Sequence, residues 1–297
     1  MEARLQANTS TIRVLETVIP DEAQRRSGIQ QRCIFRQSQM GLKCFCNSVT
    51  PIDMTRKPRN SIVEPIQELD RIKVVDNGEE LLSLRKHCPT LLFREEPDMA
   101  GGPRLFFLRE SLIAMLNKAS KALPKRHKLI IWSAFRTMEY QKHIYNDVFT
   151  HFKEKHPGWP FNILRRETNR FVHPPHAKTP PGHSTGGAVD LTVIGPDGKD
   201  LDMTSPFGTE REEARKVSAT YDSKLTPQSR KNRQILIDAM TSADFTNYAG
   251  EWWHWSYGDS CWAWRAGRKT AFYGLTEANP EILQILKTHK KKKTKRG

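Results

Sequence analysis

Apolar residues recur at helical spacing between Leu108 and Leu123. The apolar positions are Leu108, Leu112, Met115, Leu116, Ala119 and Ala122. A stripe at intervals of three and four residues predicts an amphipathic helix. A turn at Pro124 separates this helix from the short apolar run Leu129–Trp132, which is typical of a buried strand. Thr137 is a residue type that caps helices, so we expect a second helix from there to about Val148.

Four shorter patterns complete the predicted elements. Thr226 and Pro227 form a favoured pair of cap and first-turn residues, and they predict a helix. The other three are a strand at Ala188–Val193, an aromatic strand-like run at Glu251–Trp255 and a last helix at Pro280–Lys287. Strands mixed with helices, without regular alternation and without an internal repeat, favour an α+β fold with a small sheet and flanking helices.

Two regions of the chain lack periodicity. Residues 1–60 mix polar residues with short apolar pieces, and residues 152–182 hold six prolines, which predicts a long loop. We therefore expect an N-terminal extension at residues 1–60, partly disordered, and one folded domain at residues 61–275. Residues 276–297 are expected to form a short helix and a basic tail.

The charge of the chain is strongly positive, with a formal net charge of +15. Seven of the 48 Lys and Arg residues lie in the last eleven positions, and six of those seven fall within Lys290–Arg296. A solvated end that aids solubility is the favoured interpretation, and binding of nucleic acid or another polyanion is the alternative. The sequence indicates no oligomeric state.

The chain contains no run of about 18 apolar residues, so no membrane span is predicted. The first twenty residues have no continuous apolar segment of the kind found in secretory signals, which leads us to expect a cytoplasmic protein. A different true start would make a periplasmic location the expectation.

The five cysteines, Cys33, Cys44, Cys46, Cys88 and Cys261, do not form a disulfide framework, because they are odd in number and sparse. Cys44 and Cys46 lack the spacing of a zinc-binding pair, and no second pair complements them. We expect free thiols.

A histidine and an aspartate that suit a metal site occur in His183–Asp190, with two glycines between them. Gly186 and Gly187 allow the chain to bend so that the two side chains can meet. Imidazole nitrogen and carboxylate oxygen are both good ligands for Zn²⁺. A buried histidine hydrogen-bonded to a strand aspartate is the structural alternative for this segment alone.

A second imidazole and a second carboxylate occur in Glu251–His254. Three protein ligands and one open position define a catalytic zinc site, which His183, Asp190 and His254 would complete. Glu251 is then left as a general base that takes a proton from the attacking water. Residues i and i+3 share a face on a helix but not on a regular strand, so either a helical turn or a bulge must bring Glu251 to His254.

An arginine completes the candidate site. Arg136 follows the predicted strand at Leu129–Trp132, and a fixed guanidinium can stabilise the oxyanion of peptide hydrolysis. A lone arginine in a basic protein is usually a surface residue. Arg136 is therefore a catalytic candidate only in combination with the other two segments.

These three segments, in this order, resemble the D-alanyl-D-alanine dipeptidases of the VanX type, within the zinc D,D-peptidase superfamily. The segments Asp190–Val193, Trp252–Trp253 and Asn232–Arg233 also look like this family, and the resemblance covers roughly residues 66–260. It implies the D,D-peptidase or hedgehog-like zinc peptidase fold, with a mostly antiparallel sheet. It also implies one Zn²⁺ held by His183, Asp190 and His254, with Glu251 as base and Arg136 as oxyanion stabiliser.

Two departures from the family pattern concern the substrate. Pro181 stands where the family usually has a serine that helps to hold the substrate's C-terminus, and Gly208 stands where it has an aspartate that meets the free amine. Glycine cannot pair with an ammonium group, so Glu210 or Glu212 is our hypothesis for that role. Trp253 is expected to line the substrate cleft, since aromatic residues line such pockets.

The sequence therefore predicts a zinc metallopeptidase that hydrolyses D-Ala-D-Ala or a related short wall peptide. A D,D- or L,D-carboxypeptidase that acts on longer wall peptides is one alternative, and Gly208 favours it. A binding module that keeps a zinc site without turnover is another, but the presence of all five catalytic positions argues against it. Neither His173 nor His176 is expected to bind the metal.

Overall fold

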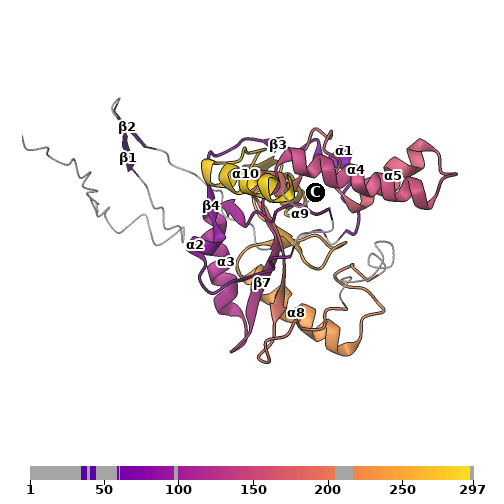
Figure 1. Ribbon diagram of the computed structural model, residues 1–297. Coiled ribbons are helices and arrows are strands. Elements are labelled where there is room, and N and C mark those ends of the chain that lie inside the picture. The colour runs from indigo at the N-terminus through magenta and orange to yellow at the C-terminus, as the bar shows by residue number, and fades with distance from the viewer. Residues whose placement is uncertain are drawn as a thin grey trace, which may run out of the picture. The chain divides into compact units, whose positions relative to one another are not determined.

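Figure 1 shows the computed structural model of the chain, which describes residues 35–38, 41–44, 59, 61–96, 100–204 and 217–294. The chain divides into two compact units, Met1–Asp53 and Met54–Gly297. In the first unit, strands β1 (Phe35–Ser38) and β2 (Gly41–Cys44) pair in antiparallel fashion. The second unit contains the predicted folded domain. The predicted division of the chain at residues 60 and 275 stays a prediction.

The second unit is built on a five-stranded sheet. Its strands, in spatial order, are β5 (Leu92–Phe93), β7 (Lys128–Ser133), β8 (Ala188–Ile194), β10 (His254–Ser256) and β9 (Thr246–Asn247). Strands β5 and β7 are parallel, and the other neighbours are antiparallel. The mostly antiparallel sheet and its flanking helices confirm the predicted α+β class.

Two small strand pairs and nine helices surround this sheet among the described residues. Strand β3 (Lys73–Val74) pairs with β11 (Thr270–Ala271), and β4 (Leu81–Ser83) pairs with β6 (Phe107–Arg109). The helices are α1 (Ile66–Leu69), α2 (Leu84–His87), α3 (Glu110–Ala122), α4 (Met138–Lys155), α5 (Phe161–Phe171), α6 (Gly182–Thr185), α8 (Pro227–Ser242), α9 (Ser260–Arg265) and α10 (Pro280–Thr294).

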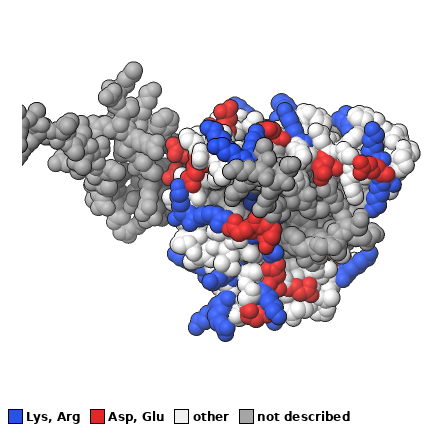
Figure 2. Space-filling view, viewed as in Figure 1, with Lys and Arg blue, Asp and Glu red and all other residues white. Residues whose placement is uncertain are grey.

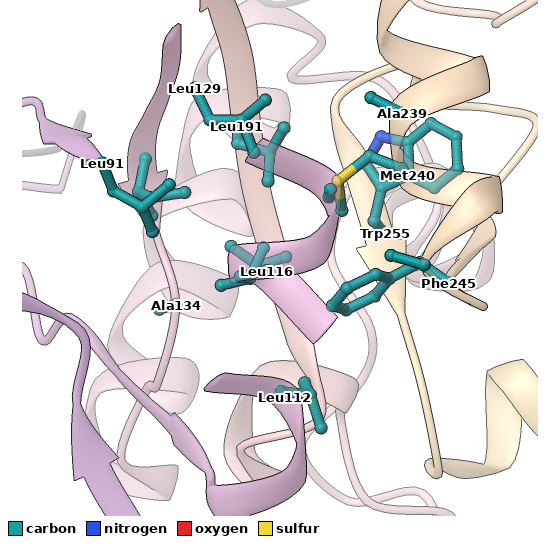
Figure 3. Close-up of a cluster of buried hydrophobic side chains, with 14 of the residues drawn as sticks. Leu91, Leu112, Leu116, Leu129, Ala134, Leu191, Ala239, Met240, Phe245 and Trp255 are labelled. Carbon is teal, nitrogen blue, oxygen red and sulfur yellow. The ribbon is translucent and has the colours of Figure 1, made fainter. Parts of the chain in front are cut away.

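The main hydrophobic core lies between one face of the sheet and helices α3 and α8. Leu112 and Leu116 of α3 meet Ala239 and Met240 of α8, and Figure 3 shows these side chains converging with those of the strands. The sheet contributes alternate residues, as the period of two in a strand requires. These residues are Leu129 and Ile131 of β7, Val189, Leu191 and Val193 of β8, and Trp255 of β10.

The other face of the same strands carries the polar residues that matter for function. Because successive side chains on a strand point to opposite faces, Asp190 lies opposite to the core-facing Val189 and Leu191. His254 has the same relation to Trp255, which is fully buried in the core. The alternation therefore places Asp190 and His254 together on the face away from α3 and α8.

Most of the predicted elements are confirmed. The helix predicted at Leu108–Leu123 is α3, and the strand at Leu129–Trp132 is β7. Thr137 and Thr226 cap α4 and α8, since each side-chain oxygen accepts a hydrogen bond from the backbone three residues later.

The prediction of a long loop at residues 152–182 is wrong. Helix α4 continues to Lys155, and α5 occupies Phe161–Phe171. Leu164 packs with Val148 and Phe152 of α4, so the two helices bury a cluster of their own. The six prolines mislead because they all lie outside the helices, and Pro160 only precedes the first turn of α5.

The last helix is longer than predicted. Helix α10 extends from Pro280 to Thr294 rather than to Lys287, because its lysines are good helix formers and no Gly or Pro interrupts them. Ile282 of α10 is fully buried against Leu81, Leu105, Phe107 and Phe135. On the visible face of the described residues, Lys and Arg lie interspersed with Asp and Glu (Figure 2).

Two smaller predictions are tested by the described residues. Cys88 and Cys261 are buried free thiols, as expected, whereas the side chains of Cys33, Cys44 and Cys46 lie outside the described ones. Within the described ranges, no helix has both the length and the apolar character needed to cross a membrane.

A glycine with positive φ makes the turn between α6 and β8. Gly186 has φ +71°, and a Cβ atom there would approach Leu81 Cδ2 to 2.4 Å. Both the backbone conformation and the close contact therefore require glycine, which permits the chain to pass from His183 into β8.

We expect Gly186→Ala to lower the free energy of unfolding by about 2–4 kcal/mol, because strain at positive φ and a steric clash act together. Gly198→Ala is the matched control, because Gly198 has φ +80° and nothing within 4 Å of its added Cβ. Gly198→Ala is expected to lower the free energy of unfolding by about 1 kcal/mol, through backbone strain alone. Urea denaturation of both variants measures the difference, and equal losses would show that the contact with Leu81 is unimportant.

Candidate metal centre and catalytic residues

Three separate elements bring His183, Asp190 and His254 together. His183 lies on α6, Asp190 lies in the middle of β8, and His254 begins β10. One potential ligand atom from each residue lies within 4.8 Å of the other two. A zinc ion binds each ligand at about 2.0–2.2 Å, so the three atoms need only a small adjustment to share one ion.

The strand register sets the distance between Asp190 and His254. These two residues are direct partners in the antiparallel pair β8–β10, and His254 Nδ1 lies 2.9 Å from Asp190 Oδ1. His183 Nε2 lies 3.3 Å from the other carboxylate oxygen, Oδ2. Asp190 therefore lies between the two imidazoles, and all three side chains are largely buried.

The hydrogen bond of His183 to the backbone fits a metal ligand. Its Nδ1 lies 2.7 Å from the carbonyl oxygen of Ala134, which can only accept, so Nδ1 carries the proton. Nε2 is then left with a lone pair directed toward Asp190. A backbone carbonyl on the second ring nitrogen is the usual way in which proteins orient a metal-binding histidine. Two imidazoles and one carboxylate are a donor set that zinc accepts, so the residues present fit this metal.

The protonation of two of the three groups, His183 and Asp190, also suits a cation. Burial and the nearby charge of Arg136 lower the pKa of His183 to about 4, so its imidazole is neutral at pH 7. Burial alone would raise the pKa of Asp190, but its contacts with both histidines hold it well below the usual range. Burial alone would lower the pKa of His254. Its hydrogen bond to Asp190 and the charge of that carboxylate outweigh burial, so the pKa is raised. A raised pKa favours the protonated imidazole, with which a metal ion competes, so metal binding is expected to weaken in acid.

Arg136 borders the same cluster. It follows β7, where a β-bulge between Ile131 and Ser133 sets Ser133 opposite Asp190. The guanidinium donates to Ser133 Oγ through Nε and Nη2, and Nη2 also lies 3.2 Å from Asp190 Oδ2. Its side chain is 22% exposed, and among the described residues Nη1 has no hydrogen-bond partner. Arg136 is thus fixed beside Asp190 with one donor group available.

Glu251 begins the tight turn that leads into His254. The amide of His254 donates to the carbonyl oxygen of Glu251 at 3.1 Å, and β10 begins at His254 itself. The sequence left a helical turn and a bulge open, and the structure shows a single turn. Within the described part of the chain, the Glu251 carboxylate makes no hydrogen bond or ion pair.

Burial is the main reason why the pKa of Glu251 is raised to about 7. The positive charges of His254 and Arg136 oppose this change, whereas Asp190 and Glu64 add to it. A carboxyl group with a pKa near neutrality, which interacts with the charges of His254 and Asp190, has the properties of a general base.

The other residues singled out from the sequence lie outside the metal-ligand cluster or outside the described residues. Trp253 is half-buried and packs against Trp132 and Trp252 of the core, and its role in substrate binding stays a prediction. Glu210, Glu212 and Gly208 lie outside the described residues. His173 contacts the carbonyl oxygen of Thr179, His176 is exposed, and neither belongs to the described metal-ligand cluster.

Sequence reasoning missed three groups that orient the site. They are the carbonyl oxygen of Ala134, the hydroxyl of Ser133, and the amide of Asn247, whose Nδ2 donates to the carbonyl oxygens of Glu251 and His254 at 3.1 and 3.0 Å. A backbone carbonyl leaves no signal in a sequence. Ser133 was visible only as a polar residue after the strand predicted at Leu129–Trp132, and Asn247 lay between the predicted elements.

Comparison with known proteins identifies the family of the chain. A family model described as D-ala-D-ala dipeptidase matches residues 98–269, a range that contains all five predicted catalytic positions. The chain belongs to this family. Membership confirms the predicted enzyme class, a metallopeptidase, and the resemblance from which it was inferred.

Two curated relatives carry the same name. A D-alanyl-D-alanine dipeptidase of Synechocystis sp. is 27% identical over 255 residues, which cover 76% of this chain and 99% of the relative. A D-alanyl-D-alanine dipeptidase of Escherichia coli (strain K12) is 36% identical over 72 residues, 24% of this chain and 35% of the relative.

Among solved structures, similarity is found to a vancomycin-resistance D,D-pentapeptidase, VanY, in complex with Zn(II). It is 16% identical with a TM-score of 0.30, and the match covers 68% of this chain and 96% of VanY. Similarity is also found to the LD-carboxypeptidase LdcB, at 18% identity with a TM-score of 0.30, covering 62% of this chain and 71% of LdcB.

The raised pKa of Glu251 predicts a pH-dependent effect of Glu251→Gln on the stability of the metal-free protein. Between its ordinary pKa of 4.5 and about 7, the unfolded chain releases this proton while the folded chain keeps it. Wild-type stability is therefore lost through this window as pH rises, and glutamine, which cannot ionise, avoids the loss. We expect the variant to be about 1–3 kcal/mol more stable than wild type at pH 8, with little difference at pH 4.5.

Thermal unfolding in the presence of a chelator measures this difference across pH. The chelator is necessary because a bound cation favours the ionised carboxylate. A difference in stability that does not change between pH 4.5 and pH 8 would contradict the assignment of a raised pKa to Glu251.

Proposed function

We propose that the chain is a zinc-dependent dipeptidase that hydrolyses D-Ala-D-Ala or related short peptidoglycan peptides. The observation that carries this proposal is the meeting of His183, Asp190 and His254 on one face of the sheet, with Glu251 on the turn directly before His254. The names of the curated relatives support the choice of substrate.

In this proposal, His183, Asp190 and His254 hold one Zn²⁺. When bound, the ion supplies a Lewis acid that polarises the scissile carbonyl group and lowers the pKa of water toward neutrality. His183 is prepared for this role by its hydrogen bond to Ala134, and Asp190 by its low pKa.

Glu251 is proposed as the general base. Its carboxylate takes a proton from the attacking water and later returns it to the leaving amine. The Glu251 carboxyl group must therefore be ionised at the start of each turnover. A pKa near neutrality suits both transfers, because the same group must accept and then donate.

Arg136 is proposed to stabilise the negative charge that develops on the carbonyl oxygen. Ser133 and Asp190 hold the guanidinium through Nε and Nη2, which leaves Nη1 as the donor for the oxyanion. A donor fixed before the reaction stabilises the transition state without reorganisation.

Trp253 and Glu210 are proposed to contact the substrate. Trp253 follows Glu251 by two residues and is only half-buried, which supports a role for its ring in lining a substrate cleft beside the general base. Glu210 would supply the anion that a free substrate amine needs, since Gly208 cannot. Glu210→Ala is expected to raise KM for a free dipeptide with little change in kcat.

A D,D- or L,D-carboxypeptidase that acts on longer wall peptides is the second candidate. Gly208 favours it, because a site without a fixed anion has no means of selecting a free N-terminus. A blocked or extended peptide would then be accepted as well as a dipeptide or better.

The test is release of D-alanine from D-Ala-D-Ala by the purified protein with one equivalent of zinc. We expect release that a chelator abolishes and that zinc restores. Glu251→Ala is expected to bind zinc as wild type does and to lose activity by about 10²–10⁴-fold, the usual contribution of a general base. Release that continues in the chelator would refute a metal-dependent mechanism.

An N-acetylated tripeptide that ends in D-Ala-D-Ala separates the two candidate functions. A dipeptidase is expected to cleave the free dipeptide and to leave the blocked peptide intact. If only the blocked peptide is cleaved, the carboxypeptidase assignment replaces the dipeptidase assignment.

A further inference from the structure

Arg233 of α8 is a buried cation outside the candidate catalytic cluster. It is 2% exposed, and its side-chain hydrogen bonds to described residues all go to backbone carbonyl oxygens. Nε and Nη2 donate to Met203 at 2.9 and 2.7 Å. Nη2 also donates to Val217 at 2.7 Å, and Nη1 donates to Ala219 at 2.5 Å and Thr220 at 3.3 Å. One guanidinium thereby holds two stretches of chain that are separate in sequence.

The stretch that Arg233 holds, residues 217–220, lies against the loop that contains Glu251. The amide of Trp252 donates to the carbonyl oxygen of Ser218 at 2.9 Å, and the amide of Thr220 donates to Ala249, also at 2.9 Å. In addition, the Arg233 guanidinium lies 5.4 Å from the ring centroid of Trp252. The residue next to the proposed base is therefore held by the backbone that Arg233 organises.

A second connection runs through Thr220 and Asn247. Thr220 Oγ1 donates to Asn247 Oδ1 at 2.5 Å, which fixes the orientation of the Asn247 side chain. With its oxygen occupied, Asn247 directs Nδ2 at the carbonyl oxygens of Glu251 and His254. Both ends of the Glu251 turn thus depend on a residue that Thr220 orients.

The metal cluster has a further support in the sheet. Asp190 and His254 are held by the ladder of β8 and β10, and His183 by its contact with Ala134. Glu251 precedes β10, so no strand pairing holds it. Loss of the Arg233 contacts would therefore move Glu251 more than it moves the three metal-binding side chains.

We propose that Arg233 is a positioning residue that sets the location of Glu251 through residues 217–220 and Asn247. The proposal rests on the assignment of Glu251 as the general base. Arginine is needed because its planar group presents five donors in a fixed geometry, whereas lysine presents three from a single nitrogen. Lysine at this position would leave some of the four carbonyl groups, of Met203, Val217, Ala219 and Thr220, without this donor.

The first experiment compares Arg233→Lys with wild type by hydrogen–deuterium exchange on the zinc-loaded protein. We expect exchange at least about tenfold faster in peptides that cover residues 248–254, because the Trp252 amide loses its fixed acceptor. Peptides that cover β8, residues 188–194, are expected to exchange as in wild type. Unchanged exchange at residues 248–254 would overturn the proposal.

The second experiment measures kcat for D-Ala-D-Ala together with bound zinc. A displacement of about 1 Å can cost about 100-fold in rate, so we expect kcat to fall by about 10–100-fold while one zinc per chain remains bound. Thr220→Val, which removes the hydroxyl at nearly constant volume, is expected to show the same pattern more weakly. A fall in kcat that matches a loss of zinc would show that Arg233 supports the metal cluster, and would also overturn the proposal.

Two control variants on the same helix distinguish positioning from general stability. Arg230→Lys makes the same chemical change at an exposed position and is expected to behave as wild type. Leu236→Val lowers stability through the core, and its kcat below the unfolding range is expected to match wild type. If Leu236→Val loses as much kcat as Arg233→Lys at equal stability, the positioning role is refuted. If the wild-type protein cleaves no tested peptide, the proposed function fails, and the exchange experiment still decides whether Arg233 holds the turn.

Discussion

The antiparallel register that sets His254 opposite Asp190 is the constraint on which the site depends. A shift of one residue in either strand would turn one of these side chains toward the hydrophobic core. The register is held because the same strands bury Val189, Leu191 and Trp255 on their other face, against α3 and α8. Burial of those apolar side chains therefore supplies much of the free energy that keeps the polar pair in contact.

The irregular segments of the site depend on buried arginines rather than on the sheet. Arg109 donates to the carbonyl oxygen of Thr185 next to the Gly186 turn, and Arg265 donates to Ser256 at the end of β10 and to Glu64. Arg233 serves the segment beside Glu251 in the same way. A buried guanidinium is costly unless its donors are satisfied. Arg233 donates to backbone carbonyl oxygens, whereas Arg109 and Arg265 also form ion pairs, with Asp76 and Glu64 respectively.

Much of the fold and the site could be predicted because the signals are local. The stripe of α3, the caps Thr137 and Thr226, and the apolar alternation of β8 are each contained in a short window of sequence. The three metal-binding candidates and Glu251 were recognisable because their side-chain chemistry is distinctive and their spacing matches a family.

Other features depended on contacts between distant residues. Helix α5 was missed because its apolar positions have meaning only against Val148 and Phe152 of α4. The form of the Glu251 turn and the roles of Ala134 and Asn247 depend on hydrogen bonds to backbone atoms, which no side-chain pattern reveals.

The most direct test of the metal centre is a crystal structure of the zinc-loaded protein with anomalous diffraction data collected at the zinc absorption edge. We expect one strong anomalous peak per chain, about 2.0–2.2 Å from His183 Nε2, an Asp190 carboxylate oxygen and a ring nitrogen of His254. Glu251 is expected to lie near this peak without binding the ion. A peak at another set of residues, or no peak between these three side chains in protein that contains one equivalent of zinc, would contradict the assignment.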